Sequence, residues 1–176
     1  MFGNTFSLTG CIKINSKGIE MDEYDSAADT AAHIAEVAKN LSIFVSELVN
    51  RAGSHDKSKF GVEEKSAFDK ITPLLKNTTY GSDGYKAALK EQKPAIDHHY
   101  QNNPHHPEHY KNGICDMNLV DLLEMLADWF AATKRHANGD ILKSLEINTD
   151  RFEIGAQLHW ILENTIREFF LEKTND

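Results

Sequence analysis

Apolar residues recur every three or four positions along three long segments of the chain, and this spacing predicts amphipathic helices. The segments are residues 25–51, 118–136 and 148–171. Shorter helices are predicted at residues 62–75, 83–91, 95–101 and 140–145, separated by turn-forming residues. The apolar stripe of the first segment consists of Ile34, Val37, Ala38, Leu41, Phe44, Val45, Leu48 and Val49. We therefore expect an all-α chain that folds as a helical bundle.

Residues 1–24 do not share this pattern. The stretch from Phe6 to Met21 alternates weakly in polarity and contains Gly10 and Gly18, which predicts a short hairpin or an irregular arm. We divide the chain into an N-terminal arm, residues 1–24, and one helical domain, residues 25–176. At 176 residues the chain has the length of a single domain that buries a core without disulfides.

The formal net charge is −8, from 27 acidic and 19 basic residues. Such a chain repels DNA and RNA on average, and no basic run offsets the repulsion, so we expect no nucleic-acid polymer as a partner. No apolar run approaches the ~20 residues that span a bilayer, and the N-terminus lacks the features of a signal peptide. Cys11 and Cys115 form no CxxC pair and are expected to be free thiols. We expect a cytoplasmic protein without a membrane partner, and the sequence leaves self-association into a homo-oligomer open.

Histidine is unusually dense in one part of the chain. Five of the nine histidines fall between residues 98 and 109, namely His98, His99, His105, His106 and His109. Histidine is the commonest metal ligand in proteins. Pro104 and Pro107 restrict the loop around two of them, which reduces the entropy lost when ligands are fixed. A backbone hydrogen bond explains any single loop histidine equally well, but it does not explain the whole cluster.

The adjacent pair His55-Asp56 is a second candidate for metal binding. One imidazole and one carboxylate at the start of a helix can reach the same divalent ion, although the pair alone is more common as a surface turn. Other known site types lack support in the sequence. Two isolated cysteines cannot form a zinc finger, and no HExxH, GxxxxGK[ST] or GxGxxG motif is present.

The predicted helix at 118–136 carries acidic residues along one edge of its apolar face. Asp121, Glu124 and Asp128 fall on one stripe at about 100° per residue. Because Trp129 and Phe130 follow Asp128 directly, an unpaired carboxylate there would be costly to bury. A metal ion or another cation would offset that cost, and a solvated acidic face is the alternative.

In chain order the candidates are a helical histidine, a His-Asp pair, a histidine, a His-His pair with a glutamate, and a helical aspartate. This order resembles the HD superfamily of metal-dependent phosphohydrolases. Over about residues 29–165, the chain resembles a group of small uncharacterised HD-like proteins of bacteria and phages. The segments that carry this resemblance read T-x-x-H-I-x-x-V, R-A-x-x-H-D-x-S-K, H-H-P-E-H and M-x-L-x-D-L-x-E-M-L-A-D-W.

The resemblance implies an HD-like helical bundle with one or two divalent ions, of Mn, Co, Fe, Zn or Mg. The ligands that it implies are His33, His55, Asp56, His99, His105, His106 and Asp128. Asp56 is expected to bridge the two ions. His99 is preferred to His98 because its seven-residue distance from His106 leaves one histidine on each side of the bend at residues 102–104.

The same resemblance suggests which residues act on a substrate. Lys59 stands where related H-D-x-G-K proteins have the lysine that contacts substrate phosphate. The full set of expected catalytic residues is Lys59, Glu63, Glu108, Glu124 and Arg135. In this set the cations neutralise phosphoryl charge and the acids move protons or support the ligands. The inserted Pro107 and the missing Gly-Tyr-Pro segment argue against hydrolysis of cyclic dinucleotides.

The expected function is therefore hydrolysis of a nucleotide or another small phosphoester by metal-activated water. The expected site of action is the cytoplasm, or the host cytoplasm if the gene belongs to a phage. Two alternatives remain open at this point. One is an HD-fold di-iron oxygenase, and the other is a non-catalytic protein that binds a metal ion or a nucleotide.

Overall fold

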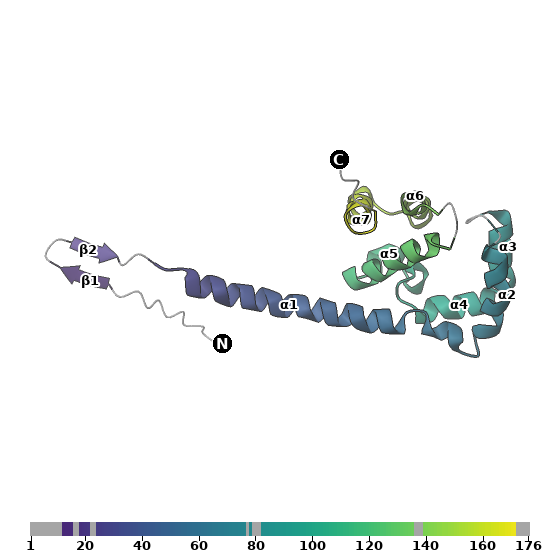
Figure 1. Ribbon diagram of the computed structural model, residues 1–176, viewed down its shortest axis with the longest axis horizontal. Coiled ribbons are helices and arrows are strands. Elements are labelled where there is room, and N and C mark those ends of the chain that lie inside the picture. Colours follow the sequence, from purple (N-terminus) through teal and green to yellow (C-terminus); the bar gives the residue numbers. More distant parts are fainter. Residues whose placement is uncertain are drawn as a thin grey trace. The chain divides into compact units, whose positions relative to one another are not determined.

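The computed structural model describes residues 12–15, 18–21, 24–76, 78, 82–135 and 139–171. Within these residues the protein is helical apart from one hairpin, so the predicted all-α class is confirmed (Figure 1). The hairpin lies in the N-terminal arm, where β1 (Ile12–Asn15) pairs with β2 (Gly18–Met21) in antiparallel orientation. Ile12 lies opposite Met21, and Asn15 lies opposite Gly18. The structure thus selects the hairpin from the two arrangements that the sequence allowed.

The helices begin and end close to the predicted positions in most cases. No helix among the described residues is long and apolar enough to cross a membrane.

Three short 3-10 helices, labelled η, accompany the α-helices: η1 follows α1, and η2 and η3 lie in the segment between α4 and α5. In chain order the elements are α1 (Ala27–Ser54), η1 (Lys57–Phe60), α2 (Lys65–Lys76), α3 (Asp83–Glu91), α4 (Lys93–Asn102), η2 (Pro107–His109), η3 (Gly113–Asp116), α5 (Leu119–Thr133), α6 (Ile141–Phe152) and α7 (Ala156–Phe169).

Two compact units divide the chain within α1. The first unit is Met1–Phe44 and the second is Val45–Asp176. This division differs from the predicted boundary after residue 24. The apolar period of α1 continues without interruption through Phe44, so the sequence gives no sign of a boundary there.

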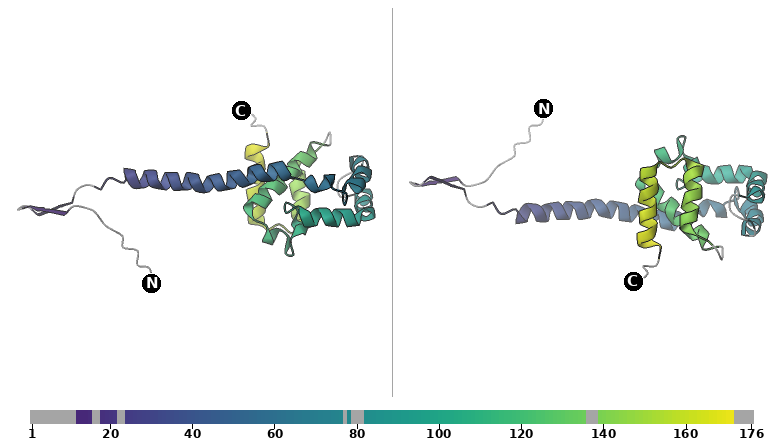
Figure 2. Two further views of the ribbon diagram at one scale, coloured as in Figure 1. Left: turned by 90° about the horizontal axis from the view of Figure 1, so that it is seen from below. Right: turned by 90° about the horizontal axis from the view of Figure 1, so that it is seen from above.

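The hydrophobic core of the second unit lies between α5, α6 and α7, which pack on one another (Figures 1 and 2). Each helix supplies aliphatic side chains at helical spacing. The most buried residues of this core are Leu126, Ile141, Leu145, Ile154, Leu162 and Ile166. Because α5 is anchored in this core, the polar side of the same helix is held in a fixed position.

The last two helices correct one prediction. The sequence suggested one long helix over 148–171, but α6 continues to Phe152 and α7 begins only at Ala156. Glu153 adopts a left-handed conformation with φ of 52°, and the backbone N–H of Ile154 donates to the carbonyl of Thr149. This ends α6 in the manner of a Schellman motif. Ile154 then turns into the core, where 7% of it is exposed, so burial of a single side chain outweighs the continuous helical pattern.

Candidate metal centre

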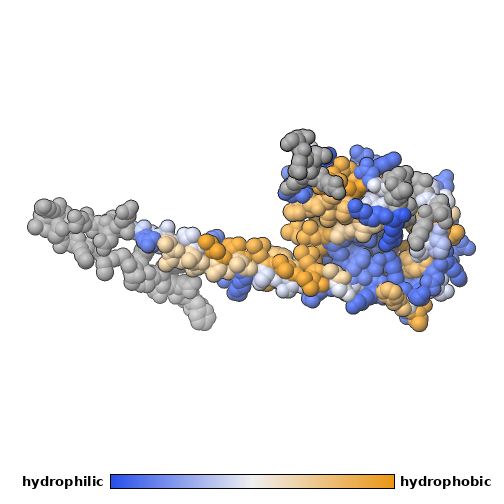
Figure 3. All heavy atoms as spheres, viewed as in Figure 1, coloured by the Kyte–Doolittle hydropathy of each residue, from blue (hydrophilic) through white to orange (hydrophobic). Residues whose placement is uncertain are grey.

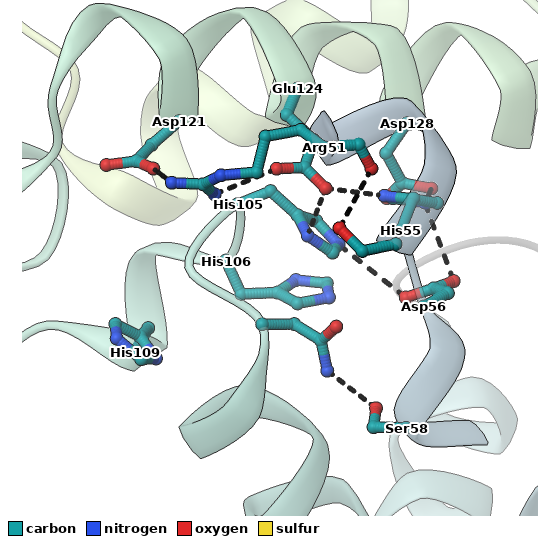
Figure 4. A network of polar contacts seen from close by, with 12 residues as sticks. Arg51, His55, Asp56, Ser58, His105, His106, His109, Asp121, Glu124 and Asp128 are labelled. Atoms are coloured by element: carbon teal, nitrogen blue, oxygen red, sulfur yellow. Dashed lines mark hydrogen bonds and ion pairs between the residues drawn. The ribbon is translucent and has the colours of Figure 1, made fainter. Parts of the chain in front are cut away.

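The candidate site lies in the second unit, where three parts of the chain meet. The end of α1 and the turn after it supply His55 and Asp56, and α5 supplies Asp128. The α4 helix and the loop after it supply His99, His105 and His106. Figure 4 shows the rings of His55, His105 and His106 gathered beside the carboxylate of Asp56. Residues more than 70 positions apart in sequence are thus brought to one place.

Three histidine rings turn their Nε2 atoms toward one another and toward Asp56. Oδ1 of Asp56 lies 3.3 Å from Nε2 of His99 and 3.7 Å from Nε2 of His105. Nε2 of His106 lies 2.9 Å from Nε2 of His99. One donor atom from each of these four residues lies within 4.8 Å of all the others. Ligands held at about 2.0–2.2 Å from a single ion have this kind of mutual spacing.

Several polar atoms in this group lack a hydrogen bond among the described residues, although Oδ1 of Asp56 lies near His99 and Nδ1 of His105 lies 3.2 Å from Oε1 of Glu124. Oδ1 of Asp56 and both ring nitrogens of His105 are buried without a hydrogen bond. A buried polar group without a partner costs about 1–3 kcal/mol, and more if it is charged. Native proteins keep buried polar atoms without hydrogen bonds mainly where a water molecule, an ion or a ligand binds to them. The donor set and its unsatisfied atoms therefore fit a divalent cation.

A second group of donors lies on the other side of the Asp56 carboxylate. Nε2 of His55 is 3.6 Å from Oδ2 of Asp56 and 3.6 Å from Oδ1 of Asp128. The two oxygens of Asp56 thus face different groups of ligands. Asp56 belongs to both groups, and its expected role as a bridge between two ions stays a prediction.

Asp56 also has an unusual backbone conformation. Its φ of 56° lies in the left-handed region, which few residues other than glycine adopt. Aspartate tolerates this region better than most residues, but the conformation still costs free energy. The turn separates the end of α1 from η1. It presents the carboxylate between the two groups of donors.

Two carboxylates orient the histidines from behind. Glu64 is fully buried and accepts hydrogen bonds from Nδ1 of His98, at 2.7 Å, and Nδ1 of His99, at 3.0 Å. Glu124 accepts one from Nδ1 of His55, at 2.9 Å. Because a carboxylate only accepts, Nδ1 of His55 and Nδ1 of His99 each carry a proton, which leaves Nε2 of each ring as the nitrogen that can bind a metal ion. Carboxylate–histidine pairs of this kind are typical of metal sites.

Glu124 is itself fixed by an arginine. The guanidinium of Arg51 donates to Glu124, at 3.0 Å, and to Asp121, at 2.9 Å. Asp121 accepts a further hydrogen bond from the hydroxyl of Tyr110 and caps the backbone at Asn118. The acidic edge of α5 is therefore a bonded network and not a solvated face.

The ionisation states at neutral pH suit metal binding. Burial lowers the pKa of His106 to about 3, and the neighbouring His105 and His99 act in the same direction. Burial also lowers the pKa of His99 and of His105. Although burial opposes it, the contact with His55 lowers the pKa of Asp128 to about 2. These histidines are neutral and the aspartate is ionised, as metal coordination requires.

His55 behaves differently from the other histidines in the site. Its contact with Asp128, followed by that with Glu124, raises its pKa to about 9 against the effect of burial. In the metal-free protein His55 therefore carries a proton at neutral pH. Metal binding at this position must release that proton, so affinity there rises with pH up to about 9.

The metal-free protein should lose stability as the pH falls below about 6.5. An unfolded histidine takes up a proton near pH 6.5, whereas folded His106 does so only near pH 3. The contribution of such a histidine to the free energy of unfolding is therefore constant above pH 6.5. Below pH 6.5 it decreases by up to about 1.4 kcal/mol for each unit by which the pH falls. His55 has a raised pKa, so its contribution is constant below pH 6.5 and is lost only between 6.5 and about 9.

Urea unfolding in the presence of a chelator between pH 7 and pH 5 measures this effect. The midpoint should fall steadily over the interval. His106→Gln removes one of the titrating groups and should flatten the dependence. A midpoint that is constant from pH 7 to pH 5 in the wild type would contradict the expected protonation states.

The structure brings together most of the predicted ligands. His55, Asp56, His99, His105, His106 and Asp128 all belong to the donor groups, and Glu124 adjoins them. His98 does not contribute an Nε2 atom to any of the groups, which favours His99 as the ligand. Lys59 lies at the edge of the cluster, where its ammonium group donates to Asp56 and lies over the ring of Phe68.

Other predicted residues lie outside the cluster. Glu63 is exposed, and its buried neighbour Glu64 occupies the inner position. Glu108 forms an ion pair with Arg151 at 2.6 Å and belongs to none of the donor groups. Arg135 is exposed just beyond the end of α5. The structure gives these three side chains no part in the donor groups.

His33 also lies outside the groups of donors. It is an exposed residue of α1 in the first unit, whereas all the donors belong to the second unit. Its role as a ligand remains a prediction from the resemblance. The donor groups reach four members without it, so the cluster does not depend on it.

Two supporting residues were missed at the sequence level. Arg51 stands four residues before His55, about one helical turn away at the end of α1, and this spacing was a usable signal. Glu64 had no comparable signal, because nothing in the Glu63-Glu64 pair indicates which carboxylate is buried.

Comparison with known proteins identifies the family of the chain. Residues 22–174 match the profile of a family described as "Family of unknown function (DUF5662)". No curated protein and no solved structure matches the chain. Because the match spans most of the sequence and includes every donor described above, the chain belongs to this family of unknown function, DUF5662.

Proposed function

We propose that this protein is a metal-dependent hydrolase that acts on a nucleotide or another small phosphoester. The observation that carries the proposal is the convergence of three imidazole Nε2 atoms on a buried, unsatisfied oxygen of Asp56. Such a group is difficult to explain as a stabilising feature of the fold, because its unpaired atoms destabilise the metal-free protein. The HD-like order of the ligands supports hydrolysis of a phosphoester in particular.

The donor set favours some metals over others. His99, His105 and His106 with Asp56 offer three nitrogens and one oxygen. Imidazole ligands suit Zn, Fe and Co, whereas Mg prefers oxygen ligands in an octahedral arrangement. Mg is therefore the least favoured of the expected metals at this position. His55, Asp56 and Asp128 offer more oxygen and would hold the second ion.

The residues of the chain have separate parts in the proposed reaction. A bound divalent ion supplies Lewis acidity and acidifies water near neutral pH. Glu64 and Glu124 hold the histidine rings so that their Nε2 atoms face the ion. Lys59 is about one-third exposed and lies beside Asp56, where its ammonium group can bind a phosphoryl oxygen of the substrate.

A test of this function combines elemental analysis with a panel of nucleotides and phosphomonoesters in the presence of Zn, Mn, Co or Fe. We expect metal-dependent release of phosphate from at least one class of substrate. Lys59→Met should lower kcat/KM at least about 100-fold while the metal content is unchanged. Lys57→Met, an exposed lysine on the same short helix, is the matched control. Full metal occupancy without turnover across the panel would contradict hydrolysis and favour a non-catalytic binder.

The nitrogen-rich donor set also supports a second candidate, a di-iron oxygenase. Histidine and carboxylate ligands together hold iron in many oxygen-activating proteins. The same purified protein distinguishes the two functions. Iron at two equivalents with substrate-dependent oxygen uptake, and no phosphate release, would establish the oxygenase instead.

A further inference from the structure

The first unit carries an uncovered row of large apolar side chains on α1. Ile34, Val37, Leu41 and Phe44 are 61%, 42%, 58% and 50% exposed. No described residue of α1 is buried. Figure 3 shows apolar atoms along one side of this helix. A row of this kind in a water-soluble helix marks a surface that another element covers.

The spacing of the row indicates what covers it. The four residues are three, four and three positions apart, which is the alternation of the a and d positions of a heptad. A period of 3.5 residues keeps a narrow seam facing a single partner helix. Ala31 and Ala38 are seven residues apart, at the e positions beside this seam. Their small side chains permit close approach of a second backbone.

We propose that α1 pairs with α1 of a second copy of this chain in an antiparallel coiled coil. In an antiparallel pair each a position faces a d position. Ile34 then faces Phe44 of the second copy, and Val37 faces its Leu41. The row is therefore complementary to itself about a twofold axis, as an isologous dimer requires. The axis lies beside Ala38, which faces the same alanine of the second copy.

Charge favours this pairing over the alternatives. The antiparallel register places His33, a g position, opposite Glu47 of the second copy, whose half-exposed carboxylate also pairs with Arg51 of its own helix. A parallel pair would align His33 with alanine. A lipid surface is disfavoured, because the outer side of α1 carries Glu36 beside Lys39 and is not basic.

The oligomeric state of the full chain is the first test. Light scattering coupled to gel filtration should give twice the chain mass of 19.9 kDa. Leu41→Glu should raise the dimer dissociation constant at least about 100-fold, because a charge then enters the seam of both copies. Ser42→Glu adds the same charge at an outward position and should leave the dimer intact. Metal content should be unchanged in both variants, since the donors lie in the second unit.

Cysteine cross-linking tests the orientation. In a Cys11→Ser, Cys115→Ser background, Ala38→Cys should form a disulfide-linked dimer on mild oxidation. Lys39→Cys, one residue away and outward, should not. Cross-linking through Leu41→Cys but not through Ala38→Cys would show a parallel pair and overturn the proposal. A monomeric wild type in which Leu41→Glu lowers the thermal stability would overturn it as well, because the row would then be covered within one chain.

Discussion

Asp56→Asn should reduce metal binding below detection and abolish the metal-dependent activity. Both oxygens of Asp56 are used, one by the group with His99 and His105 and the other by the group with His55. The amide removes the negative charge and replaces one oxygen by a nitrogen that cannot ligate. We therefore expect at least about a 1000-fold loss of affinity, more than the loss of a ligand that serves one ion.

Elemental analysis and titration calorimetry with Zn and Mn measure this loss. Asp69→Asn is a suitable control, because Asp69 is an exposed aspartate on α2 that pairs only with Lys65 among the described residues. It should bind metal as the wild type does. Undiminished stoichiometry in Asp56→Asn would remove Asp56 from the site and with it the bridged arrangement.

Asp56→Gly separates metal binding from folding. Glycine adopts the φ of 56° found at this position without the cost that a side chain brings. It also removes the unsatisfied oxygen Oδ1. The variant also loses the ion pairs of Asp56 with Lys59 and His55, which oppose these gains. The free energy of unfolding of the metal-free variant should therefore stay within about 1 kcal/mol of that of the metal-free wild type, although the variant binds no metal. Asp56→Ala lacks this conformational benefit and should be less stable than Asp56→Gly by about 1 kcal/mol, measured by urea unfolding.

The fold was predictable where the apolar period and the turn residues agree. In α3, Asp83–Glu91, the predicted and observed ends coincide. The division between α6 and α7 was not predictable, because the sequence through Ile154 continues a helical pattern. The break depends on the fit of one isoleucine into a core built from three helices, and that information is not local.

The candidate site was predictable in its ligand types more than in its surroundings. Histidine and aspartate have few uses that explain a cluster as dense as the one around His105, so their chemistry was visible in the sequence. The carboxylates that orient the ligand histidines can be identified only when it is known which side chains are buried beside those rings. Glu124 and Glu64 both perform this role, yet only Glu124 lies on a helix whose face could be assigned from the period.

Glu64→Gln should weaken metal binding about 10- to 100-fold although Glu64 is not a ligand. The buried carboxylate accepts hydrogen bonds from Nδ1 of His98 and His99 and from the hydroxyl of Ser58. The glutamine amide offers only one accepting oxygen, so its N–H group would face a donor. His99 would relieve this conflict by moving its proton to Nε2, where it blocks the metal.

The same substitution should lower the free energy of unfolding of the metal-free protein by about 1–3 kcal/mol, because one buried donor loses its partner. Glu63→Gln is the matched control, since Glu63 is exposed and should change stability by no more than about 0.5 kcal/mol. Metal competition assays and urea unfolding measure the two effects separately. If Glu64→Gln lowered stability but left the metal affinity within about threefold of the wild type, Glu64 would support the fold alone.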